Sequence, residues 1–142
     1  MKFQMFLFGC IGIATEIFFV ALMDNFASFQ AKGIIDPRLV GYSYIWMFFI
    51  YMWIPLAYHY FYPKVAHLSL IIRLLIYATS LIIAEFIAGA TLDLLTGTCP
   101  WDYTGKTAFE FMGYARLDYF PFWMLFGLFC EKICGKLAKS VG

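Results

Sequence analysis

The sequence predicts an all-α membrane protein with four transmembrane helices, and two observations lead to this class. The first is composition: of 142 residues, 63% are hydrophobic and 13% are charged, whereas soluble domains average about 25% charged residues. The mean hydropathy is +0.79. The second is the presence of four apolar segments that each reach the length of about 20 residues needed to cross a bilayer. The predicted organisation is therefore a single four-helix transmembrane domain over residues 1–142.

The predicted spans cover residues 3–23, 40–60, 68–95 and 119–137. Pro55 lies inside the second span and is expected to kink it, because proline removes a helical hydrogen bond. The third span is long enough to tilt or to project from the membrane. The first span, which follows Lys2, has an alternative as a signal peptide. Glu16 interrupts its apolar stretch and no small-residue cleavage site follows, so a membrane span is favoured.

Basic residues predict the orientation of these spans. Six lie on the side of the two termini, namely Lys2, Lys64, Arg73, Lys132, Lys136 and Lys139. Four lie on the other side, namely Lys32, Arg38, Lys106 and Arg116. Because cytoplasmic loops carry an excess of lysine and arginine, both termini are predicted to be cytoplasmic. The expected location is the cytoplasmic (inner or plasma) membrane.

Two acidic residues inside the predicted spans are candidate functional residues. Glu16 and Glu85 lie at similar depth, about 20 Å from the cytoplasmic edge at about 1.5 Å per residue. A carboxyl group at such a depth is costly and marks a functional site by default. The residues that share their helix faces are Gly9, Gly12, Gly89 and Asp93. Since glycine faces allow helices to approach closely, the first and third helices are predicted to pack with both glutamates pointing inward.

The two glutamates have several predicted roles. They share a proton, they bind a cation, or they are satisfied by Arg38 or Arg116 or by tyrosine hydroxyls, which would make them a structural polar core. No basic residue lies at their depth. At least one of them is therefore expected to be protonated near neutral pH, because desolvation and like charge both raise the pKa of a carboxyl group.

A faint internal repeat relates the same two regions. Residues 16–24 align with residues 85–93, with Glu, Ala and Asp at the same offsets. Both helices would run in the same direction across the membrane. The pattern indicates either a parallel duplication of a two-helix hairpin or a chance similarity between apolar sequences.

The predicted outer turn, residues 96–103 (TGTCPWDY), is the most distinctive polar segment. Pro100 favours an extended backbone at the preceding cysteine, and Trp101 and Tyr103 suit the headgroup region. Asp102 is expected to cap the following turn or to pair with Arg116. Arg116 has Asp118 as its alternative partner. The turn is interpreted either as a plug that closes the bundle or as a lid that contacts a ligand.

Several function classes receive no support from the sequence. The net charge of +1 gives no basic field for nucleic acid. A metal site from histidine and cysteine side chains would have nonspecific spacing, so no metal and no cofactor is predicted. No phosphate-binding loop, nucleophile elbow or HExxH motif occurs. The candidate ligands for such a metal site are His59, His67, Cys130 and Cys134. The four cysteines, at positions 10, 99, 130 and 134, show no disulfide framework.

The chain resembles the small four-span proteins of the transmembrane-protein-229 type and the bacterial ABC-transporter type IV (CmpB-like) proteins. The segments that carry the resemblance are residues 9–12 (GCIG) with Glu16, 41–46 (GYSYIW), 73–77 (RLLIY), Glu85 with Gly89, 97–103 (GTCPWDY), 116–123 (RLDYFPFW) and 127–128 (GL) before Glu131. Ile13 departs from the tryptophan found in relatives. The resemblance implies a four-helix membrane protein and no particular mechanism. The transporter label brings no ATPase motif, so any ATPase would be another subunit.

Three functions are therefore considered. The favoured one is a transport-related, permease-like membrane protein that works as an oligomer, because four helices alone enclose only a narrow pathway. The second is an accessory subunit of a larger membrane complex. The third is a membrane enzyme acting on lipid headgroups, with Glu85, Asp93 or Asp102 as acid or base. A role other than catalysis is favoured, with membrane lipids and either further copies of the chain or a larger membrane complex as partners.

Overall fold

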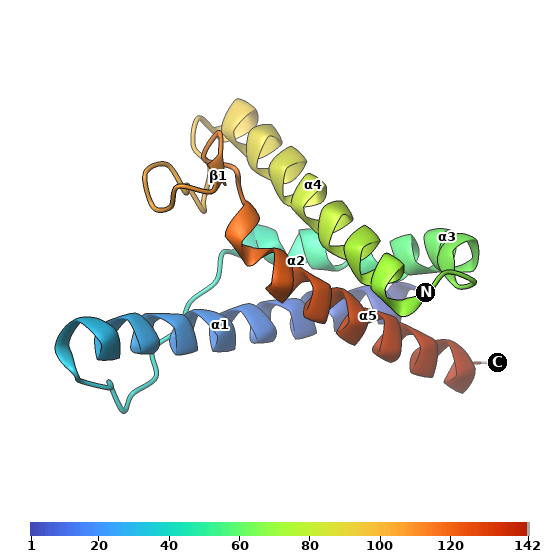
Figure 1. The fold of residues 1–142 in the computed structure, drawn as a ribbon. Helices are drawn as coiled ribbons and strands as arrows, with labels where there is room; N and C mark the ends of the chain where they lie inside the picture. Colours follow the sequence, from blue (N-terminus) through green and yellow to red (C-terminus); the bar gives the residue numbers. More distant parts are fainter. Residues whose placement is uncertain (142) are drawn as a thin grey trace. The chain divides into compact units, whose positions relative to one another are not determined.

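The computed structural model describes residues 1–141, and side chains up to residue 138. Gly142 and the side chain of Lys139, which entered the orientation count, lie outside the described part. The described chain is mainly helical (Figure 1). Its elements are α1 (Lys2–Lys32), α2 (Ile45–Tyr51), α3 (Ile54–Val65), α4 (Leu70–Thr96), β1 (Glu110–Phe111), β2 (Ala115–Arg116), the 3-10 turn η1 (Leu117–Tyr119) and α5 (Phe120–Val141).

The chain divides into two compact units, residues 1–57 and 58–142. In the first unit α2 packs against α1, and in the second unit α4 packs against α5. Helix α3 begins in the first unit and continues into the second. The single four-helix domain expected from the sequence stays a prediction, and each unit is described by itself below.

The long helices α1 and α4 correspond to the first and third predicted spans. Both are long and apolar enough to cross a membrane, with mean hydropathies of 2.2 and 2.1. Each ends at a glycine in the left-handed region, Gly33 with φ of 68° and Gly97 with φ of 78°. The N–H of each glycine donates to the carbonyl four residues earlier, at 2.8 Å in both cases. Glycine adopts this conformation without strain, so it ends the helix cleanly.

The second predicted span is not one kinked helix but two short helices, α2 and α3, separated at Met52 and Trp53. Proline has no N–H to donate and its ring clashes with the carbonyl four residues earlier, so Pro55 prevents α2 from continuing. The chain restarts as α3 at Ile54, where Pro55 occupies the first turn and no donor is needed. The expected kink is therefore a break placed just before the proline.

Helix α5 corresponds to the fourth predicted span and runs antiparallel to α4. Gly127 of α5 lies directly against the Tyr77 side chain of α4, and Glu131 of α5 contacts Arg73 near the start of α4. Helix α5 carries Glu131, Lys132 and Lys136 within its length. In the described chain the helices that reach the length and apolarity of a span are α1 and α4, so four spans are not shown.

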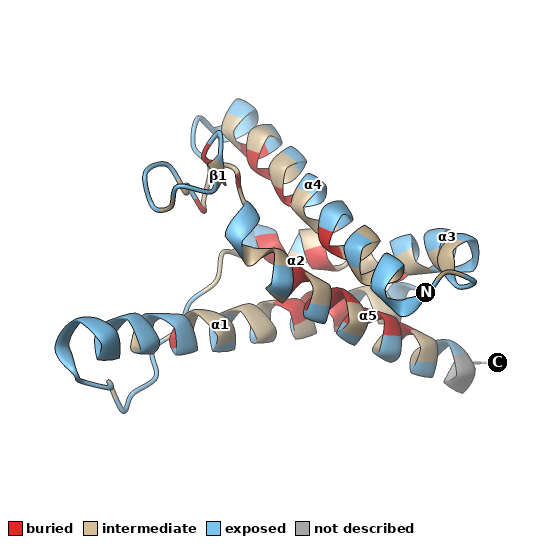
Figure 2. Cartoon of the chain, viewed as in Figure 1, coloured by how far each residue is buried: buried red, intermediate tan, exposed pale blue. Residues whose placement is uncertain are grey.

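Burial in the two long helices is low for such apolar segments (Figure 2). Only 22% of the most apolar window of α1 and 6% of that of α4 is buried within the protein. Large apolar side chains point outward along both helices, including Phe18, Ile83 and Ile87. Most of the apolar surface of these helices is therefore exposed in the described chain.

Candidate functional site

The main candidate site lies on one face of α4. Glu85, Gly89 and Asp93 follow one another at intervals of four residues, which places them on the same side of the helix. Glu85 is buried, with 9% of its surface exposed, and Gly89 is also buried. The segment that covers this face is residues 97–116, here called the cap.

The cap approaches the helix closely because Gly89 has no side chain. A Cβ atom at this position would lie 3.1 Å from Tyr114 Cβ and 3.3 Å from Cys99 Sγ. The sequence predicted Gly89 as a helix-packing residue. In the structure it makes room for the cap.

Two tyrosines of the cap reach the acidic residues of α4. The Tyr103 hydroxyl donates to Glu85 Oε1 at 2.9 Å, and the Tyr114 hydroxyl donates to Asp93 Oδ2 at 2.7 Å. Each carboxyl group on the face thus receives a hydrogen bond from the cap. The predicted candidates Glu85, Asp93 and Tyr103 are brought together here.

Trp101 lies inside the cap. Its side chain is buried, with 7% exposed, and its indole Nε1 donates to the carbonyl of Tyr114 at 3.1 Å. The indole thus joins the two ends of the cap. The expected location of Trp101 in the headgroup region stays a prediction.

A tight hairpin holds the cap in shape. Strands β1 and β2 pair through a turn at Met112 (φ 53°) and Gly113 (φ 73°), and two consecutive positive φ values are typical of a type I′ hairpin turn. Glu110 Oε2 accepts a hydrogen bond from the Gly113 N–H at 2.5 Å. The Tyr103 N–H donates to the Gly113 carbonyl at 2.9 Å. The hairpin therefore fixes the backbone of the tyrosine that reaches Glu85.

Of the two alternatives for Asp102, the cap of the following turn is found, and the pair with Arg116 is wrong. Asp102 Oδ1 accepts from the Thr104 N–H at 2.9 Å and caps its own turn. These hydrogen bonds from Thr104 lower the pKa of the Asp102 carboxyl group. Arg116 instead pairs with Asp118, at 2.6 Å between Nη2 and Oδ2, and also donates to the Tyr119 hydroxyl at 3.0 Å. Asp118 is only two residues from Arg116 and so lies within easy reach of its guanidinium. The hydrogen bonds that Arg116 donates lower the pKa of the Asp118 carboxyl group.

The other candidate, Glu16, has its own tyrosine in the first unit. The Tyr51 hydroxyl of α2 donates to Glu16 Oε2 at 3.1 Å. Helix α2 comes this close because Gly9 and Gly12 leave space for it. A Cβ atom at Gly9 would lie 2.6 Å from Phe48 Cε2, and one at Gly12 would overlap the Tyr51 ring. The predicted contact of Glu16 with Glu85 stays a prediction.

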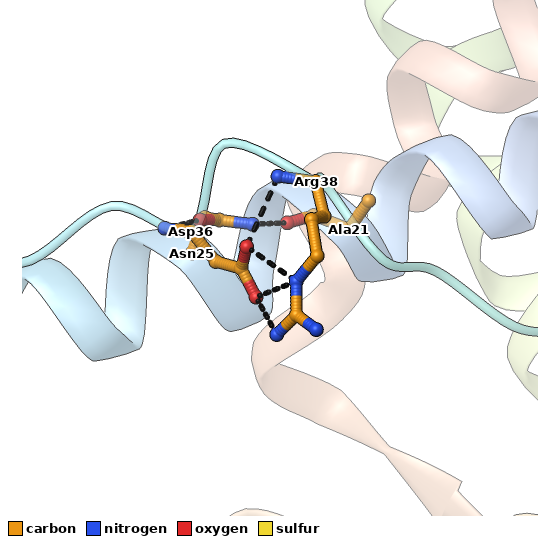
Figure 3. Close-up of polar contacts among 4 residues, drawn as sticks. All are labelled: Ala21, Asn25, Asp36 and Arg38. Atoms are coloured by element: carbon orange, nitrogen blue, oxygen red, sulfur yellow. Dashed lines mark hydrogen bonds and ion pairs between the residues drawn. The ribbon is translucent and has the colours of Figure 1, made fainter.

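Arg38, offered above as a partner for the membrane acids, is engaged elsewhere (Figure 3). Its guanidinium binds Asp36, at 2.7 Å between Nη2 and Oδ2. The backbone N–H of Asp36 donates to Asn25 Oδ1 at 2.7 Å, and Asn25 Nδ2 donates to the Ala21 carbonyl at 2.9 Å. These contacts tie the loop after α1 back to the end of the helix. Among the alternatives for the glutamates, hydrogen bonding to tyrosine is the one found in each unit.

The sequence interpretation missed a polar cluster at the other end of the second unit. Arg73 Nε lies 3.1 Å from Glu131 Oε2, and Nη2 lies 3.2 Å from Oε1. The Tyr77 hydroxyl also donates to Glu131 Oε2, at 2.5 Å. Glu131 is 7% exposed. One signal was available: Glu131 is the single acidic residue on the predicted cytoplasmic side, where it is surrounded by basic residues.

Metal chemistry gains no support from the described residues, because no three His, Cys, Asp or Glu side chains among them converge as ligands. The four cysteines are free thiols, and Cys130 and Cys134 are buried in α5. Comparisons with protein-family models, with curated proteins and with solved structures find no match. The family resemblance drawn from the motifs thus stays a prediction.

Proposed function

We propose that this chain is a multi-pass protein of the cytoplasmic membrane with a transport-related function, in which a carboxyl group on α4 is gated by the cap. The observation that carries the proposal is the pair of Glu85 and Tyr103. A buried acid on a long helix with an apolar exterior is held by a hydroxyl from a separate, loop-built segment.

Membrane insertion is supported by the exposed apolar surface of the long helices. Helix α4 has 27 residues, or about 40 Å at about 1.5 Å per residue, which exceeds a hydrocarbon core of about 30 Å. A core helix of a soluble protein would be mostly covered by its own chain. In α4 only 6% of the apolar window is buried, so lipid is the natural surrounding.

A transport-related role is supported by the sequence of polar groups along one face of α4. Acidic residues in membrane helices mark ion or proton pathways by default. Asp93 lies two turns beyond Glu85 towards the end of the helix, about 12 Å along the axis. Release of the Tyr103 hydroxyl would free the Glu85 carboxyl group to take up a proton or a cation. An oligomer would complete the pathway, because the helices of one chain alone would enclose only a narrow one.

A second candidate, an accessory subunit of a larger membrane complex, is favoured by a specific observation. The acids of both units already accept hydrogen bonds within their own unit, which suits a packing role. The exposed apolar sides of α1 and α4 would then bind the helices of a partner.

Reconstitution into liposomes tests the proposal. A pH-dependent proton or alkali-cation flux is expected for the native chain, a loss of at least 10-fold for Glu85→Gln and an increased flux for Tyr103→Phe. Asp24→Asn is the matched control, because Asp24 aligns with Asp93 in the repeat but is exposed. Absence of flux, together with a stoichiometric larger complex on mild purification, would favour the accessory subunit.

A further inference from the structure

Helix α3 has an exposed face that its role as part of a span does not explain. Tyr60 and Phe61 are 61% and 58% exposed, and Lys64 one turn later is also exposed. Leu56 and Ala57, one turn earlier, lie on the same face and are exposed too. The spacing of three and four residues gathers an aliphatic, aromatic and basic stripe on one side of a short helix.

The lysine on this stripe lies against the aromatic rings. The Lys64 ammonium nitrogen is 3.7 Å from the centre of the Tyr60 ring and 5.6 Å from that of Phe61. Cation–π contact of this kind keeps the charge above the rings without burying it. The stripe is therefore apolar along its length and positively charged at its C-terminal end.

The other side of α3 is occupied by its own unit. Tyr58 and Tyr62 stack on each other with ring centres 4.6 Å apart, and both are only partly exposed. A Cβ atom at Gly135 of α5 would lie 3.3 Å from the Tyr58 hydroxyl. Tyr58 of α3 thus lies close to α5, whereas the side chains of the stripe are exposed.

The exposed charged side chains that are described in α5 are basic. Lys132 and Lys136 of α5, which flank Gly135 in sequence, are exposed. The acid of this part of α5, Glu131, is buried against Arg73. The exposed charges of α3 and of this part of α5 are therefore positive among the described side chains, and they complement an anionic surface.

We propose that α3 lies in the membrane–water interface, with Tyr60 and Phe61 at the level of the headgroups and Lys64 and Lys132 bound to anionic phospholipid headgroups. Amphipathic rings settle at this depth, and lysine side chains extend from it to the charged layer. The stripe has the features of an interfacial helix. This proposal rests on the membrane insertion proposed above.

Spin labelling measures the depth of α3 in the full chain. Cys10 and Cys99 are replaced by alanine, while Cys130 and Cys134 stay because they are buried. Labels are placed at Phe61→Cys, Ile83→Cys on the exposed side of α4 and Lys106→Cys in the cap. In vesicles, the label at 61 is expected to lie between the other two in its relative collision rates with oxygen and a nickel chelate.

The other outcomes of the depth measurement would each overturn one of the two proposals. A label at 61 as deep as that at 83 would place α3 in the hydrocarbon core and overturn the proposal. A label as accessible as that at 106 would place α3 in water, with the same consequence. If instead the label at 83 lies in water, membrane insertion itself fails, so the two proposals fail in distinguishable ways.

Lipid retention tests the headgroup contact. The purified chain, incubated with equal amounts of phosphatidylglycerol and phosphatidylcholine, is expected to retain the anionic lipid preferentially in native mass spectrometry. Lys64→Gln and Lys132→Gln should each lower this preference by about 5-fold, and Lys64→Arg should preserve it. Equal retention of both lipids by the native chain, or a preference unchanged by both glutamine variants, would overturn the contact.

Discussion

The two units share one arrangement at their glutamates but build it from different elements. In each, a long apolar helix carries a glutamate, ends at a left-handed glycine, and receives a tyrosine hydroxyl from the chain that follows. In the first unit the tyrosine is Tyr51, carried by helix α2. In the second it is Tyr103, carried by the irregular cap. The duplication suggested by the sequence stays a prediction, because Tyr51 and Tyr103 do not occupy aligned positions.

The arrangements differ in what positions the hydroxyl. Tyr51 depends on close packing of α2 on α1, because Gly12 lies directly under its ring. Tyr103 depends on hydrogen bonds within the cap, including that of its N–H to the Gly113 carbonyl. Asp93 also accepts a tyrosine hydroxyl, whereas its aligned residue Asp24 is exposed. Around its glutamate, the first unit should therefore be sensitive to added volume and the second to changes in the cap.

Glycine substitutions should separate the units most strongly. Gly41 packs against the Ile17 carbonyl oxygen, which is backbone and cannot rotate away from a new methyl group. Gly41→Ala is expected to lower the free energy of unfolding by about 3 kcal/mol, and Gly89→Ala by about 1 kcal/mol. Unfolding in mixed detergent micelles gives both values. Equal losses at the two positions would remove the proposed difference in packing.

Among the described residues, the ion pair with a buried glutamate, Arg73 and Glu131, lies in the second unit. Glu131→Gln keeps the shape of the side chain but loses charge-assisted hydrogen bonds to Arg73, and should cost about 2 kcal/mol. The double variant Arg73→Gln/Glu131→Gln should lose less than the two single losses added, because neither partner is left with an unmatched charge. Gln4, which takes the place of Arg73 in the first unit under the repeat, is the control. Gln4→Ala should change stability by less than about 0.5 kcal/mol.

Removal of each tyrosine hydroxyl compares the two hydrogen bonds to the glutamates directly. Tyr51→Phe and Tyr103→Phe should each cost about 1 kcal/mol. Only Tyr103→Phe should loosen the cap and speed the labelling of Cys99. Burial raises the pKa of the Cys99 thiol, so labelling in the native chain should need a higher pH than that of an ordinary cysteine, because the thiolate reacts. Equal labelling rates in both variants would show that Tyr103 does not hold the cap.

The sequence was sufficient to predict the long helices and the positions of the glutamates. Apolar length predicts both ends of α4 to within two residues, whereas α1 continues for nine residues beyond the predicted end at residue 23. It also placed Glu85, Gly89 and Asp93 on one face, since four-residue spacing is a property of the helix itself. These predictions depend on local regularities that persist in any tertiary context.

The partners of those residues could not be predicted in the same way. The contact of Tyr103 with Glu85 depends on the cap, where the Tyr103 N–H donates to the carbonyl of Gly113. Asp102 and Asp118 were both candidate partners of Arg116, and the local backbone brings Asp118 to its guanidinium. Pro55 was expected to kink a helix, but the choice between a kink and a break depends on packing around the bend. Long-range and loop geometry set these outcomes.

The smallest expected effect concerns the two arginine–aspartate pairs, each joining residues two apart. Arg116 and Asp118 have side chains 19% and 30% exposed, whereas Arg38 and Asp36 are 78% and 37% exposed. Asp118→Asn should lower stability by less than about 1 kcal/mol, as is typical of partly exposed pairs. Asp36→Asn should have no measurable effect, although the Arg38 hydrogen bonds lower the pKa of Asp36 to about 2.

The contribution of Asp118 should also depend on pH. The folded-state pKa of Asp118 is lowered, so its contribution to stability is present above the ordinary pKa of about 3.9 and is lost as the pH falls through the lowered value. Denaturant unfolding at pH 6 and pH 3 should therefore show the Asp118→Asn difference shrinking at the lower pH. The double variant Asp102→Asn/Arg116→Gln is the control. Its loss of stability should equal the sum of the two single losses, and a different value would show that Asp102 and Arg116 are coupled after all.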